Sequence, residues 1–354
     1  MFFLCRVSFV LAVLMAMGCS EEPKSTLPTI QVPEKTDSDL VLNKIAKSVK
    51  TIQLETKKEA LLGHIFRVKQ YDDKLFIPDR NKVLVFDLEG KFLYQIGIQG
   101  EGPGEYRGVS SFALDPNTGN VYIASDIRIL VYTSEGELLM EKKFTNGVFN
   151  LGFVNGKLYK FIRSLGNKVN NGFGNYTSLL EFTPELELLD SIPVKSVFLK
   201  KLMVSRSPYM HYLYNNGLGT YLYYPVLSPE EIYRDTLYQY KDNKLAPYLK
   251  LDFERPQSLD EEGFKVTQIL NIIDSSSYLF CEYSQHWKRR FFVFNKRDST
   301  SYNLKVGPLD GQGEPVVLRP LDLEKDIFYY VKTSEFMDKE TEESNPIVGI
   351  VEMK

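Results

Sequence analysis

The sequence predicts an all-β protein, a six-bladed β-propeller that follows an N-terminal lipoprotein signal peptide and a flexible tether. Three observations lead to this prediction. Beyond residue 44 the chain consists of short strand-like runs separated by turn residues, with hardly any helical periodicity. The strand and turn pattern recurs about every 50 residues. The chain also contains 22 Tyr and 23 Phe, residues that fit the half-buried surface of a sheet.

The composition is that of a globular protein and excludes several other classes. The 354 residues are 43% hydrophobic and 25% charged, with a formal net charge of −3. This balance argues against a disordered chain, a collagen-like repeat and a multi-span membrane protein. Nucleic acids and anionic membrane surfaces are bound by concentrated basic faces, which this charge does not supply. We therefore expect no nucleic-acid partner.

The N-terminus has the features of a bacterial lipoprotein signal peptide, which we assign to residues 1–18. The cation Arg6 precedes the uncharged run of residues 7–17, which is too short to cross a bilayer comfortably as a helix. The run leads into the sequence AMGC, which resembles a lipobox in which Ala replaces the usual Leu. Cys19 is therefore the predicted lipidation site. The alternative is an ordinary signal peptide that a Cys follows by chance.

Residues 19–44 are predicted to form a lipidated N-terminus and a flexible tether. Cys19 is followed by the sequence SEE, which looks like the export tract of Bacteroidetes lipoproteins that face the cell exterior. The segment is rich in Pro, Ser, Thr and charged residues, and cannot bury enough apolar area to order itself. We therefore expect a surface-exposed outer-membrane lipoprotein. Its partner there is the membrane, bound through acyl chains that contribute about 0.8 kcal/mol per buried methylene.

The cysteine inventory leaves one thiol in the mature chain. Cys5 is removed with the signal peptide and Cys19 carries lipid, so Cys281 has no partner for an intramolecular disulfide. Cys281 lies in the strand-like run of residues 278–283. We expect a buried, inert thiol rather than a nucleophile.

Two units near the start of the repeats define the predicted blade. Residues 66–71, 74–77, 83–86 and 92–96 are strand-like runs joined by turns, and a meander of four strands is one propeller blade. Residues 111–140 repeat this pattern.

The number of blades follows from the spacing of the third strands. Their markers are Phe86, Tyr132, Phe182, Tyr238, Phe294 and Ile350. The intervals are 46, 50, 56, 56 and 56 residues, and the predicted domain, residues 45–354, provides about 52 residues for each of six blades. Residues 51–54 form a strand without a blade of its own, so we expect it to close the ring by pairing into the last blade. A double-sheet sandwich is the structural alternative.

Several motifs resemble those of the Bacteroidetes six-bladed β-propeller lipoproteins, a family related in pattern to NHL repeats. The motifs are GIQGEGPGEY at residues 97–106, FALD at 112–115, NVYIA at 120–124, RDTLY at 234–238, PYL at 247–249 and NPIV at 345–348. The resemblance covers essentially all of the chain after the tether. It implies the same ring-shaped fold, and the later blades depart furthest from the NHL pattern.

Some segments resemble phosphate-binding or calcium-binding motifs, but a structural role explains each of them. The Gly-rich residues 97–104 lack the Lys-Ser/Thr of a phosphate loop, so we expect a crossing between blades where glycines permit positive φ. Residues 115–120 begin like a calcium loop but fit a β-turn. His64, His211 and His286 lie far apart without metal-ligand spacing. We expect no metal and no cofactor, and the sequence contains no Gly-x-Ser-x-Gly motif.

The candidate ligand-binding residues are His64, Arg67, Tyr106, Arg107, Tyr212 and Tyr223. Tyr-rich runs at residues 209–214 and 221–224 supply two of them, because Tyr presents an apolar face with a polar tip. Ordinary strand packing is the alternative for these runs.

Together these features indicate a non-enzymatic, lipid-anchored binding or scaffold protein for a glycan, a peptide or a protein partner. The alternative is a lyase or hydrolase with its active site at the mouth of the propeller channel, where His64, Arg67 or Tyr106 could take part. A third hypothesis is a purely structural partner of another envelope protein, which a contiguous exposed apolar patch would favour.

Overall fold

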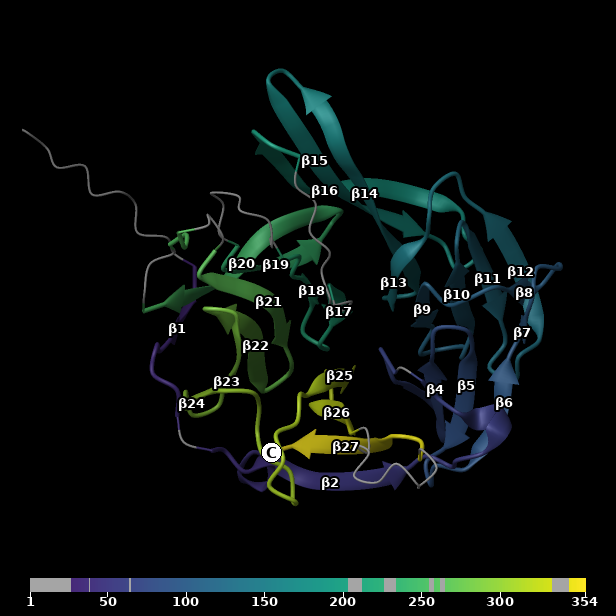
Figure 1. Ribbon diagram of the computed structural model, residues 1–354, viewed down its shortest axis with the longest axis horizontal. Helices are drawn as coiled ribbons and strands as arrows, with labels where there is room; N and C mark the ends of the chain where they lie inside the picture. Colours follow the sequence, from purple (N-terminus) through teal and green to yellow (C-terminus); the bar gives the residue numbers. More distant parts are fainter. Residues whose placement is uncertain are drawn as a thin grey trace, which may run out of the picture.

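Six sheets, each built on an antiparallel meander, are arranged radially around a central axis, so the chain forms a ring (Figure 1). The computed structural model describes residues 27–37, 39–63, 65–202, 212–225, 234–254, 258–261, 265–332 and 344–354. The described part of the chain is all-β apart from two 3-10 turns, η1 (Leu42–Lys44) and η2 (Lys58–Ala60). The predicted six-bladed propeller is confirmed.

Each blade contains four strands in meander order from the inside of the ring outward, and strand pairing within the meander is antiparallel. The strands are, for blade 1, β3 (Lys69–Tyr71), β4 (Lys74–Pro78), β5 (Val83–Asp87) and β6 (Phe92–Ile96); for blade 2, β9 (Ser111–Leu114), β10 (Val121–Ser125), β11 (Arg128–Tyr132) and β12 (Leu138–Lys143); for blade 3, β13 (Phe149–Val154), β14 (Lys157–Val169), β15 (Gly172–Phe182) and β16 (Leu188–Leu199); for blade 4, β17 (Leu213–Asn215), β18 (Thr220–Leu222), β19 (Thr236–Lys241) and β20 (Lys244–Phe253); for blade 5, β21 (Thr267–Asp274), β22 (Tyr278–Gln285), β23 (Lys288–Asn295) and β24 (Ser301–Leu304); and for blade 6, β25 (Arg319–Asp322), β26 (Ile327–Lys332), β27 (Ile347–Met353) and β2 (Ala46–Gln53).

The ring is closed by the strand that the sequence predicted. β2 comes from the start of the domain and pairs antiparallel with β27, with Thr51 opposite Gly349. The six marker residues that set the predicted spacing all lie in third strands, namely β5, β11, β15, β19, β23 and β27. Marker spacing and ring closure therefore agree with the structure.

The hydrophobic core lies between neighbouring blades. Ile52 of β2, Val348 of β27 and Phe86 of β5 belong to the cluster that joins blade 6 to blade 1. Corresponding clusters join blades 1 and 2, 2 and 3, and 3 and 4, and one large cluster unites blades 4, 5 and 6. Cys281 is a fully buried member of this last cluster, as expected for an inert thiol.

The segment before the ring differs from the predicted tether. β1 (Thr29–Val32) pairs parallel with β20 as a fifth strand of blade 4, and its Ile30 and Val32 side chains are buried. Farther along, the Asp37 N–H donates to the Asn303 carbonyl at 2.7 Å. The composition of this segment is polar overall, but Ile30 and Val32 are apolar and lie two residues apart, the spacing that places both on one face of a strand. Pairing with the open edge of β20 is sufficient to order them.

The Gly-rich segment is a crossing between blades, as predicted. It connects β6 to β9 and contains the short parallel pair β7 (Ile98–Gln99) and β8 (Glu105–Tyr106). Gly97 has φ of 65°, and a Cβ at this position would lie 2.8 Å from the Tyr132 ring. Only glycine fits both the backbone conformation and the close approach.

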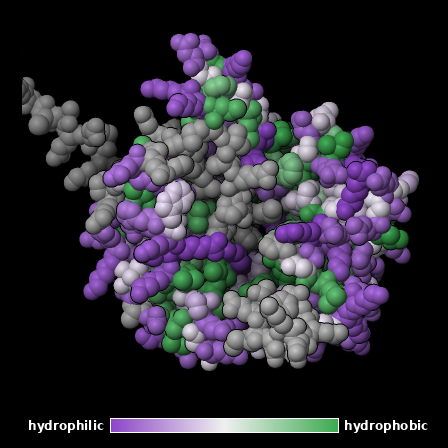
Figure 2. Space-filling view, viewed as in Figure 1, coloured by the Kyte–Doolittle hydropathy of each residue, from purple (hydrophilic) through white to green (hydrophobic). Residues whose placement is uncertain are grey.

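The surface of the described residues is mainly hydrophilic on the face that Figure 2 shows. Hydrophilic side chains cover most of its outer rim, and hydrophobic ones form small separate patches (Figure 2). Blade 3 differs from the others because β14 and β15 extend beyond the ring (Figure 1).

We expect deletion of residues 348–354 to unfold the whole domain. The deletion removes most of β27, so β2 and β26 lose their common partner and the core between blades 6 and 1 is opened to water. Urea denaturation of the purified chain measures the outcome. The control is Glu352→Gln, which removes the exposed ion pair with Lys47, alters the hydrogen bond from Ser48 and should change the free energy of unfolding by less than about 1 kcal/mol. A soluble truncated chain with a cooperative transition would contradict this account of closure.

Candidate functional site

The central channel contains a cavity of about 840 Å³, which is within the usual size range of small-molecule sites. It is lined by the inner strands of five blades, β3, β9, β13, β17 and β25, and by the turns that follow them. Each inner strand is the edge of its sheet, so backbone N–H and C=O groups without a ladder partner face the channel. These groups give the cavity wall a regular supply of hydrogen-bond donors and acceptors.

Arg67 lies at one end of this cavity, which we call the floor. Its side chain is 4% exposed, and its Nη1 donates to the carbonyl of Phe112 at 2.6 Å and to the carbonyl of Leu151 at 3.1 Å. Arg67 precedes β3, and its two acceptors lie in β9 and β13. One guanidinium therefore connects blades 1, 2 and 3 across the channel.

Lys69 lies beside Arg67 and also lines the cavity. Its side chain is half-buried, and its ammonium makes no hydrogen bond or ion pair with the residues that the structure describes. Burial, with a smaller contribution from Arg67, lowers the pKa of Lys69 to about 8, and Asp322 opposes the shift. The floor thus presents a cation that is available to a ligand.

The other end of the cavity, which we call the rim, is formed by the turns after the inner strands. Exposed carboxylates of Asp72 and Glu324 lie there, and neither forms an ion pair within the described residues. Asp322 accepts a hydrogen bond from Lys325 at 2.9 Å. The amides of Asn155 and Asn215 complete the rim and bond to each other at 2.8 Å. The cavity is therefore cationic at its floor and acidic at its rim.

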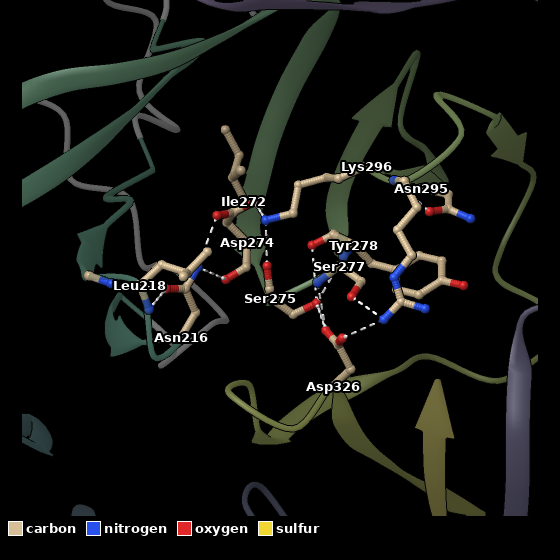
Figure 3. Close-up of polar contacts among 12 residues, drawn as sticks. Asn216, Leu218, Ile272, Asp274, Ser275, Ser277, Tyr278, Asn295, Lys296 and Asp326 are labelled. Carbon is tan, nitrogen blue, oxygen red and sulfur yellow. Dashed lines mark hydrogen bonds and ion pairs between the residues drawn. The ribbon is translucent and has the colours of Figure 1, made fainter. Parts of the chain in front are cut away.

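A polar network behind the rim joins blades 4, 5 and 6 (Figure 3). Asp274 is its centre: its carboxylate accepts from Asn216 Nδ2 at 3.0 Å and from Lys296 Nζ at 3.0 Å. Ser275 Oγ in turn donates to Asp326 at 2.5 Å.

The network also fixes one wall of the cavity. Tyr214 lines the cavity, and its hydroxyl accepts from the backbone N–H of Asp274 at 2.8 Å. The Asp274 side chain is buried, and burial raises its pKa to about 6.

Of the candidate residues from sequence, Arg67 is the one that lines the cavity; His64 lies outside the described residues. Tyr106 is fully buried between blades 1 and 2, and its hydroxyl donates to the carbonyl of Ile96 at 2.6 Å. Burial raises the pKa of Tyr106 to about 12. Tyr106 therefore has a structural role: its ring packs between blades 1 and 2, and its hydroxyl bonds to the last residue of β6, where the segment that connects these blades begins.

The remaining candidates also lie away from the cavity lining. Arg107 is exposed and pairs with Glu101 at 2.7 Å. Tyr212 is buried and stacks edge-on against Phe161 at 5.2 Å. Tyr223 is buried and its hydroxyl donates to the Ile269 carbonyl at 3.2 Å. The candidates are therefore not assembled into one site.

Lys69, Asp72 and Glu324 are the site residues that sequence reasoning missed. A signal existed for Lys69, because residues 66–71 were already assigned to the first strand of a blade and first strands line a propeller channel. No comparable signal marked Glu324, which lies in a turn of the last blade.

The structure shows no assembled metal site in the part of the chain that it describes. No group of three or more His, Cys, Asp and Glu residues there is close enough to hold a metal ion. Cys281 is buried, which raises the pKa of its thiol. Among the described residues no helix is long and apolar enough to span a membrane. Cys19 lies outside the described residues.

We expect Asp274→Asn to change how stability depends on pH. Because the pKa of Asp274 rises from 3.8 to about 6 on folding, its contribution is most favourable below pH 3.8 and is lost as the pH rises to 6. The free energy of unfolding of the wild type, relative to the variant, should therefore fall by about 2 kcal/mol between pH 4 and pH 7. Urea denaturation across this range measures the difference.

The matched control for this experiment is Asp298→Asn. Asp298 is exposed, and hydrogen bonds from Thr300 lower the pKa of its carboxyl, so its small effect should have the opposite sign. Parallel pH curves for the wild type and Asp274→Asn would show that Asp274 does not titrate as described.

Comparison with known proteins identifies a family and a shared fold. The family described as Domain of unknown function (DUF4934) matches residues 27–352. A crystal structure from Bacteroides fragilis NCTC 9343, of a protein named as exported, is similar at 19% identity with a TM-score of 0.66, over 92% of this chain and 99% of that chain. A protein of unknown function from Bacteroides caccae is similar at 12% identity and a TM-score of 0.36, over 76% of this chain and 86% of that chain. No curated protein matches. The match over residues 27–352 shows that the chain belongs to the DUF4934 family.

Proposed function

We propose that this protein is a lipid-anchored binding protein on the surface of the bacterial outer membrane, and that its central cavity holds a glycan, a peptide or a segment of a partner protein. The observation that carries the proposal is the cavity of about 840 Å³ lined by five blades. Its wall combines free strand edges, side-chain amides and an available cation, which are groups that bind ligands. The motifs at residues 97–106 and 120–124 support a relation of the repeats to NHL repeats.

Binding is favoured over catalysis by the geometry of the cavity. A general acid–base pair or an activated nucleophile needs groups within about 3 Å of each other. Among the described residues, the Lys69 ammonium hydrogen-bonds to no carboxylate, and the Tyr214 hydroxyl is engaged by the backbone of Asp274 and Ile272. The proposal of a lyase or hydrolase at the channel mouth therefore has weaker support.

Export and anchoring rest on two further observations. The Bacteroides fragilis protein that shares the fold is named as exported, and the sequence AMGC ends the apolar run before Cys19. Because the Pro28 carbonyl already accepts a hydrogen bond from Lys250 of β20, the fully extended chain from Cys19 to Pro28 spans at most about 32 Å. An anchored ring would therefore stay close to the membrane surface.

A cavity-filling substitution tests the proposed ligand site. Gly152 lines the cavity, and a Cβ there would meet no atom within 4 Å, so Gly152→Phe should fill the cavity without disturbing β13. Gly311→Phe is the matched control, because Gly311 is exposed, outside the cavity lining and equally unobstructed. Thermal shift against panels of envelope glycans and peptides is the measurement. A ligand at 100 times its Kd stabilises the native state by about 2.7 kcal/mol.

We expect the ligands found in this screen to stabilise the wild type and Gly311→Phe but not Gly152→Phe. Ligands that stabilise Gly152→Phe equally would locate binding elsewhere. The absence of any stabilising glycan or peptide would contradict a role in binding these classes and would favour a protein partner.

The anchor is tested by Cys19→Ser. We expect the wild-type protein to fractionate with the outer membrane and to carry acyl chains detectable by mass spectrometry. The Cys19→Ser protein should lack them and leave the membrane fraction, because no thiol remains to be acylated. Cys281→Ser, which alters a buried thiol, is the control and should leave fractionation unchanged. Membrane retention of Cys19→Ser would contradict the lipid anchor.

A further inference from the structure

The two ends of the cavity carry opposite charge, and this restricts what can bind. At the floor, the Lys69 ammonium has no partner among the described residues, and Arg67 adds a second positive charge beside it. At the rim, Asp72 and Glu324 are exposed carboxylates that form no ion pair within the described part of the chain. A ligand with an anionic inner end and a cationic outer end would complement both.

The distance between the floor and the rim of the cavity follows from the length of β3. Lys69 is the first residue of β3 and Asp72 follows its last residue, so the Cα atoms of the two residues are three residue steps apart along the strand. At about 3.3 Å per residue, this corresponds to roughly 10 Å along the channel. An extended tripeptide has about the same length between its terminal groups.

The channel wall favours a peptide over a sugar of the same charge. The inner strands β3, β9, β13, β17 and β25 are all sheet edges, and an extended peptide can use the backbone groups of such an edge for main-chain hydrogen bonds. A uronic acid could pair with Lys69, but it carries no cationic group for Asp72 and Glu324.

We propose that the cavity binds a short peptide with free termini, its carboxylate against Lys69 and its ammonium toward Asp72 and Glu324. The inference rests on the proposed function, in which this cavity is the ligand site, and it names the ligand class. The lowered pKa of Lys69, which burial causes, is consistent with a cation that a ligand carboxylate would stabilise. No covalent chemistry is involved.

A randomised tripeptide pool tests the proposal with the full chain. Three forms of the pool are compared by thermal shift and by competition: free termini, C-terminal amide and N-acetylated. We expect the free pool to bind at least about tenfold more tightly than the amidated pool, because amidation removes the charge-assisted hydrogen bonds to Lys69. N-acetylation should weaken binding less, because Asp72 and Glu324 are exposed to solvent.

Substitutions in the cavity test which residues cause the preferences for a free carboxylate and for a free ammonium. Lys69→Met should abolish the preference for the free carboxylate, and Lys69→Arg should restore it. Asp72→Asn combined with Glu324→Gln should abolish the preference for the free ammonium while keeping that for the carboxylate. Lys91→Met, an exposed lysine outside the cavity lining, is the matched control and should behave as the wild type.

The outcomes separate this inference from the proposed function. Equal binding of the free and amidated pools, or an unchanged preference in Lys69→Met, would overturn the peptide proposal. Stabilisation by a uronic-acid oligosaccharide but not by the free tripeptide pool, lost in Gly152→Phe, would overturn it while leaving the cavity as the ligand site. If neither probe nor any other glycan or peptide binds, the peptide proposal fails, and only the segment of a partner protein remains as an occupant under the proposed function.

Discussion

The pairing of β2 with β27 is the contact on which the rest of the ring depends. Every blade is a twisted sheet with two apolar faces, and each face must be covered by a neighbour to stay out of water. Five of the blade contacts arise between segments that follow each other in the chain, whereas the sixth needs the ring to close. Ile52 from the start of the domain and Val348 from its end meet in that last contact. The same pairing removes the edge that β27 would otherwise expose.

The radial arrangement that buries the faces also creates the cavity. Inner strands cannot pair with one another across the axis, so their edges remain open to the channel, and the channel wall becomes polar although the blades pack through apolar clusters. Arg67 donates to two of the carbonyl groups near one end, which connects three blades. The cavity therefore has Arg67 at one end and the turns after the inner strands at the other.

Charge is distributed within this compartment in a way that the whole-chain charge does not reveal. The net value of −3 is close to neutral, yet cations lie at the floor and carboxylates at the rim. Two structural networks keep these groups in place. Arg67 holds the floor, and the network centred on Asp274 holds the wall behind Tyr214, where buried polar groups satisfy one another across three blades (Figure 3).

The amino-acid sequence alone was enough to predict the strands of the first two blades, the number of blades and the closing strand. These features depend on alternation, turn residues and spacing, which can be read along the chain. It was misleading for β1, because two apolar residues in a polar segment become a strand only when an open sheet edge is available. Of these residues of the cavity lining, Arg67 was among the candidates from sequence, whereas Lys69, Asp72 and Glu324 were not. Lys69 and Glu324 belong to the first and last blades, so whether they share a cavity is decided by ring closure, a long-range constraint that no local pattern contains.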